Sequence, residues 1–307
     1  MPDSSNSRQT ICCVGEVLWD ALPEGLFPGG APLNVCCHLH ALGEQALMVS
    51  RIGSDRLGQE IVRQLESRGM SARYLQTDEQ VETGFVEVNL SVKDGPGYEI
   101  IEPAAWDFIS LTDEAETLAT KADIVVFGTL GQRNDVSRKT IQQFIKKSAL
   151  VIYDVNLRPP YDEPSIVENS LQEADIVKMN EDELMTLAGW FGWSGQREQV
   201  VEQLADAFNC RQVCITCGRD GSALFNQGSW TRQKAIPVEV RDTVGAGDAF
   251  MAAFIFGLTR FETDRERLRF AGVLGAFVAT KQGANPPYSL DDLIAFASDR
   301  GISLGFA

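Results

Sequence analysis

The sequence predicts an α/β fold with a mostly parallel central sheet, helices on both of its faces and a small additional β-sheet. Short apolar runs alternate with helix-length segments from residue 123 onward, which is the pattern of strand–helix–strand units. The runs are apolar at successive positions, as is typical of parallel strands buried on both faces. Residues 83–92 instead carry apolar side chains with a period near two, which predicts a half-buried strand.

The first third of the chain contains two strand–helix pairs and a hairpin. We expect strands at 11–14 and 48–52 and helices at 35–42 and 57–68. Pro32 lies near the start of the first helix and Gly43 just past its end, which is the usual punctuation of a helix. The strand at 83–92 is followed by a turn at 93–97 and a returning strand at 98–101. A lone hairpin is marginally stable, so we expect it to pack either as a separate sheet or as part of the main one.

Polar clusters follow the strands expected after residue 123. These strands cover 124–127, 150–153, 176–178 and 213–216, with helices at 135–147 and 163–172 between them. A hairpin at 222–233 precedes three helices, which end near residues 260, 281 and 300. Residues 189–195 are aromatic and glycine-rich, and we expect a loop there that packs on the surface. Because ligands bind beyond the carboxyl ends of parallel strands, the polar clusters are candidates for a site.

Composition and charge exclude several classes of function. The 307 residues carry a formal net charge of −16, which disfavours binding to a nucleic-acid backbone. No apolar run reaches the roughly 18 residues that span a membrane, and the polar N-terminus lacks a secretory signal, so we expect a cytoplasmic protein without membrane partners. The seven cysteines are odd in number, and we expect free thiols rather than disulfides or a metal clip. The only histidines, His38 and His40, do not share a helical face, which argues against a histidine metal site.

The most informative stretch is Asp-Thr-Val-Gly-Ala-Gly-Asp at 242–248, which leads into an apolar, alanine-rich segment. The first N–H groups of a helix lack intrahelical partners and carry partial positive charge, so such a turn can bind an anion. Glycines allow the anion to come close, and Asp248 adds a proton acceptor beside it. This combination suits phosphoryl transfer. The ordinary alternative is a glycine-rich turn with an acidic first helical turn, which is common.

The nine residues at 242–250, Asp-Thr-Val-Gly-Ala-Gly-Asp-Ala-Phe, resemble the C-terminal signature of the ribokinase-like (PfkB) sugar kinases. The resemblance implies that Asp248 is the catalytic base and that the amides of Gly245, Ala246 and Gly247 form an anion hole. Gly-Gly-Ala-Pro-Leu-Asn-Val at 29–35 is similar to the N-terminal signature of that family, and Asp-Val-Asn-Leu-Arg at 154–158 resembles its fructokinase branch. By this resemblance the guanidinium of Arg158 reaches a phosphate.

The resemblance implies a sugar pocket whose contacts are Asp20, Gly29, Gly30, Asn34, Asn156 and Asp248. Carboxylates and amides form strong hydrogen bonds with hydroxyl groups, whereas the ordinary alternative is a solvated Asp20 and an Asn34 that caps or packs. Trp106 either stacks on a sugar face or fills the core. Many fructokinase-like relatives carry an arginine where this chain has Glu102 and Pro103, and this departure leaves the sugar open.

A nucleotide site with Mg²⁺ is also implied. Asn180 and Glu183 resemble the Asn-x-x-Glu motif that organises Mg²⁺ and phosphates, often through water, and they also suit a helix N-cap with an acidic first turn. Further nucleotide contacts are implied for Thr216, Gly218, Gly221, Gly245, Gly247, Gly283 and Asn285. Asp242 belongs to the region that holds a monovalent cation such as K⁺ in the family.

The resemblance covers roughly residues 11–300 and implies one ribokinase-like kinase domain, 1–307, with a discontinuous β lid formed by about 16–30 and 81–107. It implies an ATP-dependent sugar kinase that transfers the γ-phosphoryl group to a primary hydroxyl, most like a fructokinase. Another ketose, a 2-keto-3-deoxy sugar acid or a nucleoside stays open as acceptor, and so does a sugar-sensing relative without catalysis. Lids of this family often meet in a dimer, so we also expect a homodimer through the lid.

Overall fold

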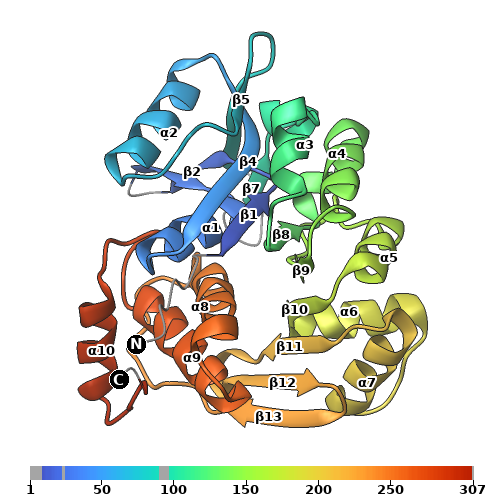
Figure 1. Ribbon diagram of the computed structural model, residues 1–307, viewed down its shortest axis with the longest axis vertical. Helices are drawn as coiled ribbons and strands as arrows, with labels where there is room; N and C mark the ends of the chain where they lie inside the picture. The colour runs from blue at the N-terminus through green and yellow to red at the C-terminus, as the bar shows by residue number, and fades with distance from the viewer. Residues whose placement is uncertain (1–8, 23–24, 90–96, 306–307) are drawn as a thin grey trace, which may run out of the picture.

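The computed structural model describes residues 9–22, 25–89 and 97–305, and its largest element is a nine-stranded sheet (Figure 1). The strand order is β13-β12-β11-β10-β9-β8-β1-β4-β5. At one edge β12 pairs antiparallel with both β11 and β13, and every other neighbouring pair is parallel, which confirms the predicted mostly parallel sheet. The strands are β1 (Thr10–Val14), β4 (Gln45–Gly53), β5 (Leu75–Asp78), β8 (Ile124–Gly128), β9 (Leu150–Asp154), β10 (Ile176–Asn180), β11 (Gln212–Thr216), β12 (Ser222–Asn226) and β13 (Ser229–Gln233).

Helices cover both faces of this sheet because alternate residues of a strand point to opposite sides. On β1, Ile11 and Cys13 belong to one hydrophobic core, and Cys12 and Val14 belong to the other. The first core is completed by α1 (Ala31–Ala41), α2 (Arg56–Ser67), α8 (Ala246–Arg260), α9 (Asp264–Ala279) and α10 (Leu290–Ser298). The second is completed by α3 (Asp113–Ala119), α4 (Asp135–Ile145), α5 (Pro164–Glu173), α6 (Glu181–Phe191) and α7 (Arg197–Phe208) (Figure 1).

A separate four-stranded sheet has the strand order β3-β2-β6-β7. Its strands are β2 (Leu18–Leu22), β3 (Gly25–Gly29), β6 (Gly84–Asn89) and β7 (Gly97–Ile100). Strands β6 and β7 form the expected hairpin, and most of its expected turn lies outside the described residues. Leu18 of β2 pairs with Gly84 of β6, so two segments that are far apart in sequence build one sheet. The hairpin is therefore part of a second sheet and not of the main one.

The expectation of a loop at 189–195 is wrong in its first half, because α6 continues through Phe191. Gly192 ends the helix in the left-handed conformation, with φ 72°. The rings of Phe191 and Trp193 lie 4.9 Å apart, and both pack against Phe208 of α7. The seven cysteines are all buried free thiols, as expected. In the described part of the chain, none of the helices is both long and apolar enough to cross a membrane.

Candidate active site

The glycine-rich turn before α8 folds as the start of a helix. Gly245 is the N-cap residue, with φ 74°, and a Cβ added there would lie 2.5 Å from the Cα of Ala284. Glycine is therefore required at this position both for its backbone conformation and for the close approach of the neighbouring loop. The N–H of Ala246 donates to the carbonyl of Thr243 at 3.2 Å, so this amide is already engaged. Asp248 follows in the first turn of the helix.

The carboxyl group of Asp248 is held by a residue from the other end of the chain. Asn34 of α1 donates from its Nδ2 to Oδ2 of Asp248 at 2.7 Å. Burial and the negative charge of Asp154 raise the pKa of Asp248 to about 6, although Lys178, Asn34 and Arg158 act in the opposite direction. A carboxyl group with this pKa is ionised at neutral pH and still basic enough to accept a proton.

A buried ion pair lies beside the turn, and the sequence analysis missed it. Lys178 of β10 places its Nζ 3.0 Å from both carboxylate oxygens of Asp154 at the end of β9, and their side chains are 8% and 4% exposed. Burial lowers the pKa of Lys178, but the nearby carboxylates outweigh this effect and raise it. A Cβ on Gly247 would lie 3.4 Å from Nζ. The available signal was a lysine within the apolar strand Ile-Val-Lys-Met.

A cavity of about 800 Å³ lies between the main sheet, the small sheet and the start of α8. Several sequence-predicted sugar residues line it, namely Asp20, Gly30, Asn34, Asn156, Arg158 and Asp248. Gly29 does not line the cavity; a Cβ there would lie 2.0 Å from Oδ2 of Asp20, so this glycine leaves room for the carboxyl group. Burial and the charge of Asp248 raise the pKa of Asp20 to about 6.

Glu16 is a second residue that the sequence analysis did not select. It follows β1, lines the same cavity and is 2% exposed. Its Oε1 accepts a hydrogen bond from the N–H of Ala31 at 3.2 Å. Burial raises its pKa to about 7, and Arg158 acts against this rise. The position of Glu16 directly after a predicted strand could have identified it, because the carboxyl ends of neighbouring parallel strands meet at one edge of the sheet, where ligands bind.

A second cavity, of about 760 Å³, lies on the other side of the turn. Its residues include the predicted nucleotide contacts Asn180, Thr216, Gly218, Gly221 and Gly247. Its wall is partly apolar, with Ile236, Val238, Phe250 and Ala276. The two cavities share four residues, namely Asn180, Thr216, Thr243 and Gly247. They therefore meet at the turn that carries Gly247 and Asp248.

Glu183 is fixed by backbone donors on both of its oxygens. Its Oε2 accepts from the N–H of Asn180 at 2.8 Å, and its Oε1 accepts from the N–H of Leu157 at 3.0 Å. Asn180 completes a capping box by accepting from the N–H of Glu183 at 2.8 Å. Glu183 thereby joins the loop after β9 to the loop after β10. Within residues 9–22, 25–89 and 97–305, no cluster of three or more His, Cys, Asp or Glu side chains suits a metal ion.

The loop after α9 contacts Asn34, which lines the first cavity. Asp242 accepts from the N–H of Val244 at 2.9 Å and from the N–H of Gly283 at 3.0 Å, so it joins the turn to this loop. Asn285 donates from Nδ2 to Oδ1 of Asn34 at 2.6 Å. Neither Gly283 nor Asn285 is among the residues that line the second cavity, of about 760 Å³. The structure thus brings Asn285 to Asn34, a predicted sugar contact, and not to the second cavity, where the resemblance implied it.

Trp106 lies in the core and not in the cavity. Its side chain is fully buried, and the guanidinium of Arg133 stacks on its ring at 4.0 Å. A Cβ on Gly84 would lie 2.5 Å from its Nε1, so the tryptophan packs at the base of β6. Of the two expectations for Trp106, stacking on a sugar is thus contradicted, because its ring has no exposed face.

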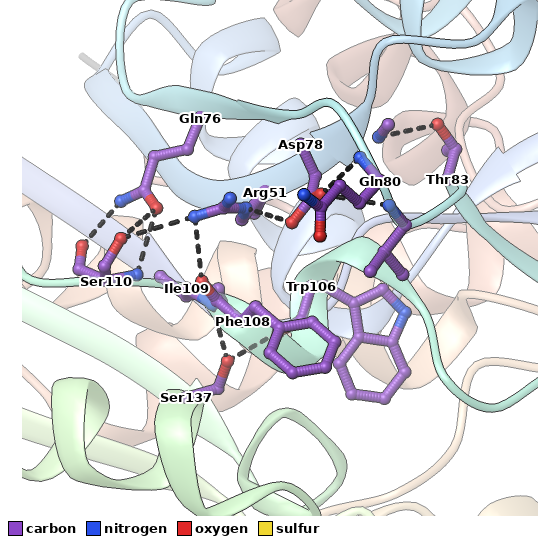
Figure 2. Close-up of polar contacts among 12 residues, drawn as sticks. Arg51, Gln76, Asp78, Gln80, Thr83, Trp106, Phe108, Ile109, Ser110 and Ser137 are labelled. Atoms are coloured by element: carbon purple, nitrogen blue, oxygen red, sulfur yellow. Dashed lines mark hydrogen bonds and ion pairs between the residues drawn. The ribbon is translucent and has the colours of Figure 1, made fainter.

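Figure 2 shows how the two ends of the β6–β7 excursion are tied to the main sheet. Arg51 of β4 forms an ion pair with Asp78 at 2.7 Å and donates to the carbonyl of Phe108 at 3.2 Å. Asp78 precedes the hairpin, and Phe108 ends the short 3₁₀ helix η1 (Ala105–Phe108) that follows it. Ser137 of α4 donates to the carbonyl of Trp106 at 2.6 Å. The β6–β7 hairpin of the small sheet is therefore anchored at both of its connections to the body.

Comparisons with known proteins place the chain in a family. The sequence profile of the pfkB family carbohydrate kinases matches residues 12–291. A sugar kinase of Pyrococcus horikoshii is 30% identical over 95% of this chain and 97% of its own. Its crystal structure, described as that of an uncharacterized sugar kinase, superimposes with a TM-score of 0.81 over 96% of this chain and 99% of that one, at 28% identity. A fructokinase of Escherichia coli is 28% identical over 89% of this chain and 94% of its own.

Proposed function

The chain belongs to the pfkB family of carbohydrate kinases, and we propose that it transfers the γ-phosphoryl group of ATP to a primary hydroxyl of a neutral monosaccharide, fructose first among them. The family membership makes it a phosphotransferase that acts on an alcohol group. One observation carries the rest of the proposal. Two cavities meet at the N-terminus of α8, where Asp248 and Gly247 lie. We call the cavity of about 800 Å³ the sugar-side cavity and the cavity of about 760 Å³ the nucleotide-side cavity.

The residues at this junction suit an in-line transfer. Asp248 accepts the proton of the sugar hydroxyl, whose oxygen forms a bond to the γ-phosphorus while the bond to the bridging oxygen breaks and ADP leaves. A positioned base of this kind contributes about 10²–10⁴-fold to the rate. The backbone amides of Gly245 and Gly247 stabilise the developing negative charge, because a helix N-terminus carries partial positive charge. Arg158, which is solvent-exposed and lines the sugar-side cavity, neutralises phosphate charge.

The nucleotide-side cavity suits ATP with Mg²⁺. Its apolar wall suits a purine ring, and its glycines leave the backbone accessible to phosphates. Both oxygens of Glu183 are engaged by backbone N–H groups, so this residue would hold Mg²⁺ through water, which is the coordination that Mg²⁺ prefers. When bound, the ion neutralises phosphate charge. Asp242 accepts a hydrogen bond from the N–H of Gly283 and so holds the loop at 283–285 in place. In this proposal, carbonyl groups in the region of Asp242 would hold K⁺. A Pyrococcus horikoshii relative of 28% identity was crystallised with ATP.

The charge of the sugar-side cavity favours a neutral acceptor over a sugar acid or a sugar phosphate. Five carboxyl groups line it, those of Glu16, Asp20, Glu99, Glu183 and Asp248. Its two cationic lining residues are Arg158, which the transferred phosphoryl group would engage, and Lys178, which is paired with Asp154. An anionic substrate would therefore meet mostly negative charge. Carboxylates accept hydrogen bonds from the hydroxyl groups of a polyol.

Fructose is the first candidate because the motif at 154–158 resembles the fructokinase branch and named fructokinases are similar over nearly the whole chain. Another ketose, a 2-keto-3-deoxy sugar acid, a nucleoside and a non-catalytic sugar sensor are the competing candidates. We propose further that the kinase domain spans residues 1–307 and that the segments 16–30 and 81–107 close over the sugar as a lid. In this proposal a homodimer forms through the lid and the enzyme works in the cytoplasm.

The test is a coupled ADP-release assay with fructose, ribose, 2-keto-3-deoxygluconate and adenosine, with wild-type protein and Asp248→Asn. We expect turnover with fructose, and a loss of about 10²–10⁴-fold in kcat for Asp248→Asn with sugar binding retained. Turnover with another acceptor only would replace fructose and keep the mechanism. Sugar binding without turnover in wild-type protein would favour a sensor.

A further inference from the structure

A chain of two side-chain hydrogen bonds leads from the loop after α9 to the catalytic carboxyl group. Asn285 donates from Nδ2 to Oδ1 of Asn34 at 2.6 Å, and Asn34 donates from Nδ2 to Oδ2 of Asp248 at 2.7 Å. An asparagine side chain has one donor end and one acceptor end. Because the acceptor end of Asn34 is occupied by a donor from Asn285, its donor end is turned toward Asp248.

The loop that carries Asn285 is fixed on both sides of this residue. The N–H of Gly283 donates to Asp242 at 3.0 Å. The carbonyl of Ala284 accepts from Nε2 of His38 at 2.9 Å, and Nδ1 of His38 accepts from the hydroxyl of Tyr288 at 3.0 Å. Burial lowers the pKa of His38 to about 4, so the ring stays neutral in this arrangement at physiological pH. His38 lies one helical turn after Asn34 on α1, so the same helix holds both ends of the contact.

We propose that Asn285 is a positioning residue for the catalytic base: its amide determines which end of the Asn34 side chain faces Asp248. The inference rests on the proposed function, in which Asp248 accepts the proton. A donor from Asn34 stabilises the charged form of Asp248 and leaves the other carboxylate oxygen for the acceptor hydroxyl. If the Asn34 amide turned over, its oxygen would face the carboxylate and repel it.

The pKa of Asp248 depends on several nearby charged groups as well as on its hydrogen bond with Asn34. The other titratable groups that act on Asp248 are Glu16, Asp20, Asp154, Arg158 and Lys178, which come from β2, β9, β10 and the loops after β1 and β9. These groups are unchanged by a substitution at residue 285. In the uncharged variant Asn285→Leu, a change in the titration of Asp248 therefore reports the orientation of Asn34, whereas in Asn285→Asp the repulsion of the new carboxylate adds to the same upward shift.

The experiment compares Asn285→Leu and the isosteric Asn285→Asp with wild-type protein. Leucine removes the donor at similar volume, and aspartate replaces the donor with an acceptor that draws the Nδ2 of Asn34 away from Asp248. Gln282→Leu is the matched control, because it removes an amide of the same loop that bonds to Arg241 at the surface. The measurements are the pH profile of kcat/KM and the ¹³C NMR titration of the Asp248 carboxyl group, assigned with Asp248→Asn.

We expect both Asn285 variants to raise the pKa of Asp248 by about one unit, since a hydrogen bond to a charged group is worth about a tenfold factor or more. The activity of the variants should then recover toward the wild-type value at alkaline pH, and Gln282→Leu should titrate like wild-type protein. An unchanged Asp248 titration, or a loss of rate that is equal at every pH, would overturn the proposal. The NMR titration needs no acceptor, so a failure of the proposed function would leave this test intact.

Discussion

Replacing Gly245 by alanine tests the anion hole most directly. Gly245 has φ 74°, and the new Cβ would lie 2.5 Å from both the Cα and the Cβ of Ala284. An L-residue in the left-handed region costs about 1–2 kcal/mol. The collision with Ala284 adds to this cost, because the atom that it meets belongs to the backbone and cannot rotate away. The start of α8 must therefore move relative to the loop at 283–285.

Such a movement displaces the amides that face the transferred phosphoryl group in the proposed mechanism. The loss of one oxyanion donor typically lowers kcat by about 10²–10³-fold, and we expect a loss of this size for Gly245→Ala. Gly192→Ala is the matched control. Gly192 has φ 72° at the end of α6, and no atom lies within 4 Å of an added Cβ. Gly192→Ala should lose about 1–2 kcal/mol of folding stability and Gly245→Ala more than this, because of the collision, but only Gly245→Ala should lose catalysis.

The assay is steady-state phosphorylation of the best acceptor under saturating ATP, combined with urea unfolding of all three proteins. If Gly245→Ala lost stability as Gly192→Ala does but kept the wild-type kcat, the amides at the start of α8 would not hold the reacting group. The catalytic role of this turn would then have to be abandoned, even if Asp248 proved to be the base.

Three further changes address other parts of the structure. Because burial raises the pKa of Asp248 to about 6 and its ionised form is the proposed base, kcat/KM should be high above that pH and fall below it, as a pH–rate profile would show. Arg133→Met leaves Asp107 buried without its partner, and we expect a loss of about 3–5 kcal/mol in unfolding free energy, whereas the exposed Arg63→Met should change the stability little. Trp106→Phe should lower stability by about 1–3 kcal/mol and leave the KM for the sugar near its wild-type value. A large rise in this KM would instead support a contact between Trp106 and the sugar.

The local elements of this fold could be predicted because their signals are short-range. The capping box of Asn180 and Glu183 and the glycine turn before α8 depend on residues within one helical turn, so a linear pattern contains them. The same reasoning failed at residues 189–191. The glycines and the aromatic residues of 189–195 suggest a loop, but the ring of Phe191 packs against Phe208 of α7 and the helix continues to Phe191.

The sequence by itself determined the alternation of strands and helices after residue 123, the polar residues that follow those strands and the family signatures. The tertiary structure alone decided that Asn285 contacts Asn34, across 251 residues, and that Trp106 is enclosed beneath the small sheet. It also decided that Lys178 pairs with Asp154. These contacts depend on how separate strands and loops pack in three dimensions, and the periodicity of one segment contains no information about the side chains that another segment brings to it.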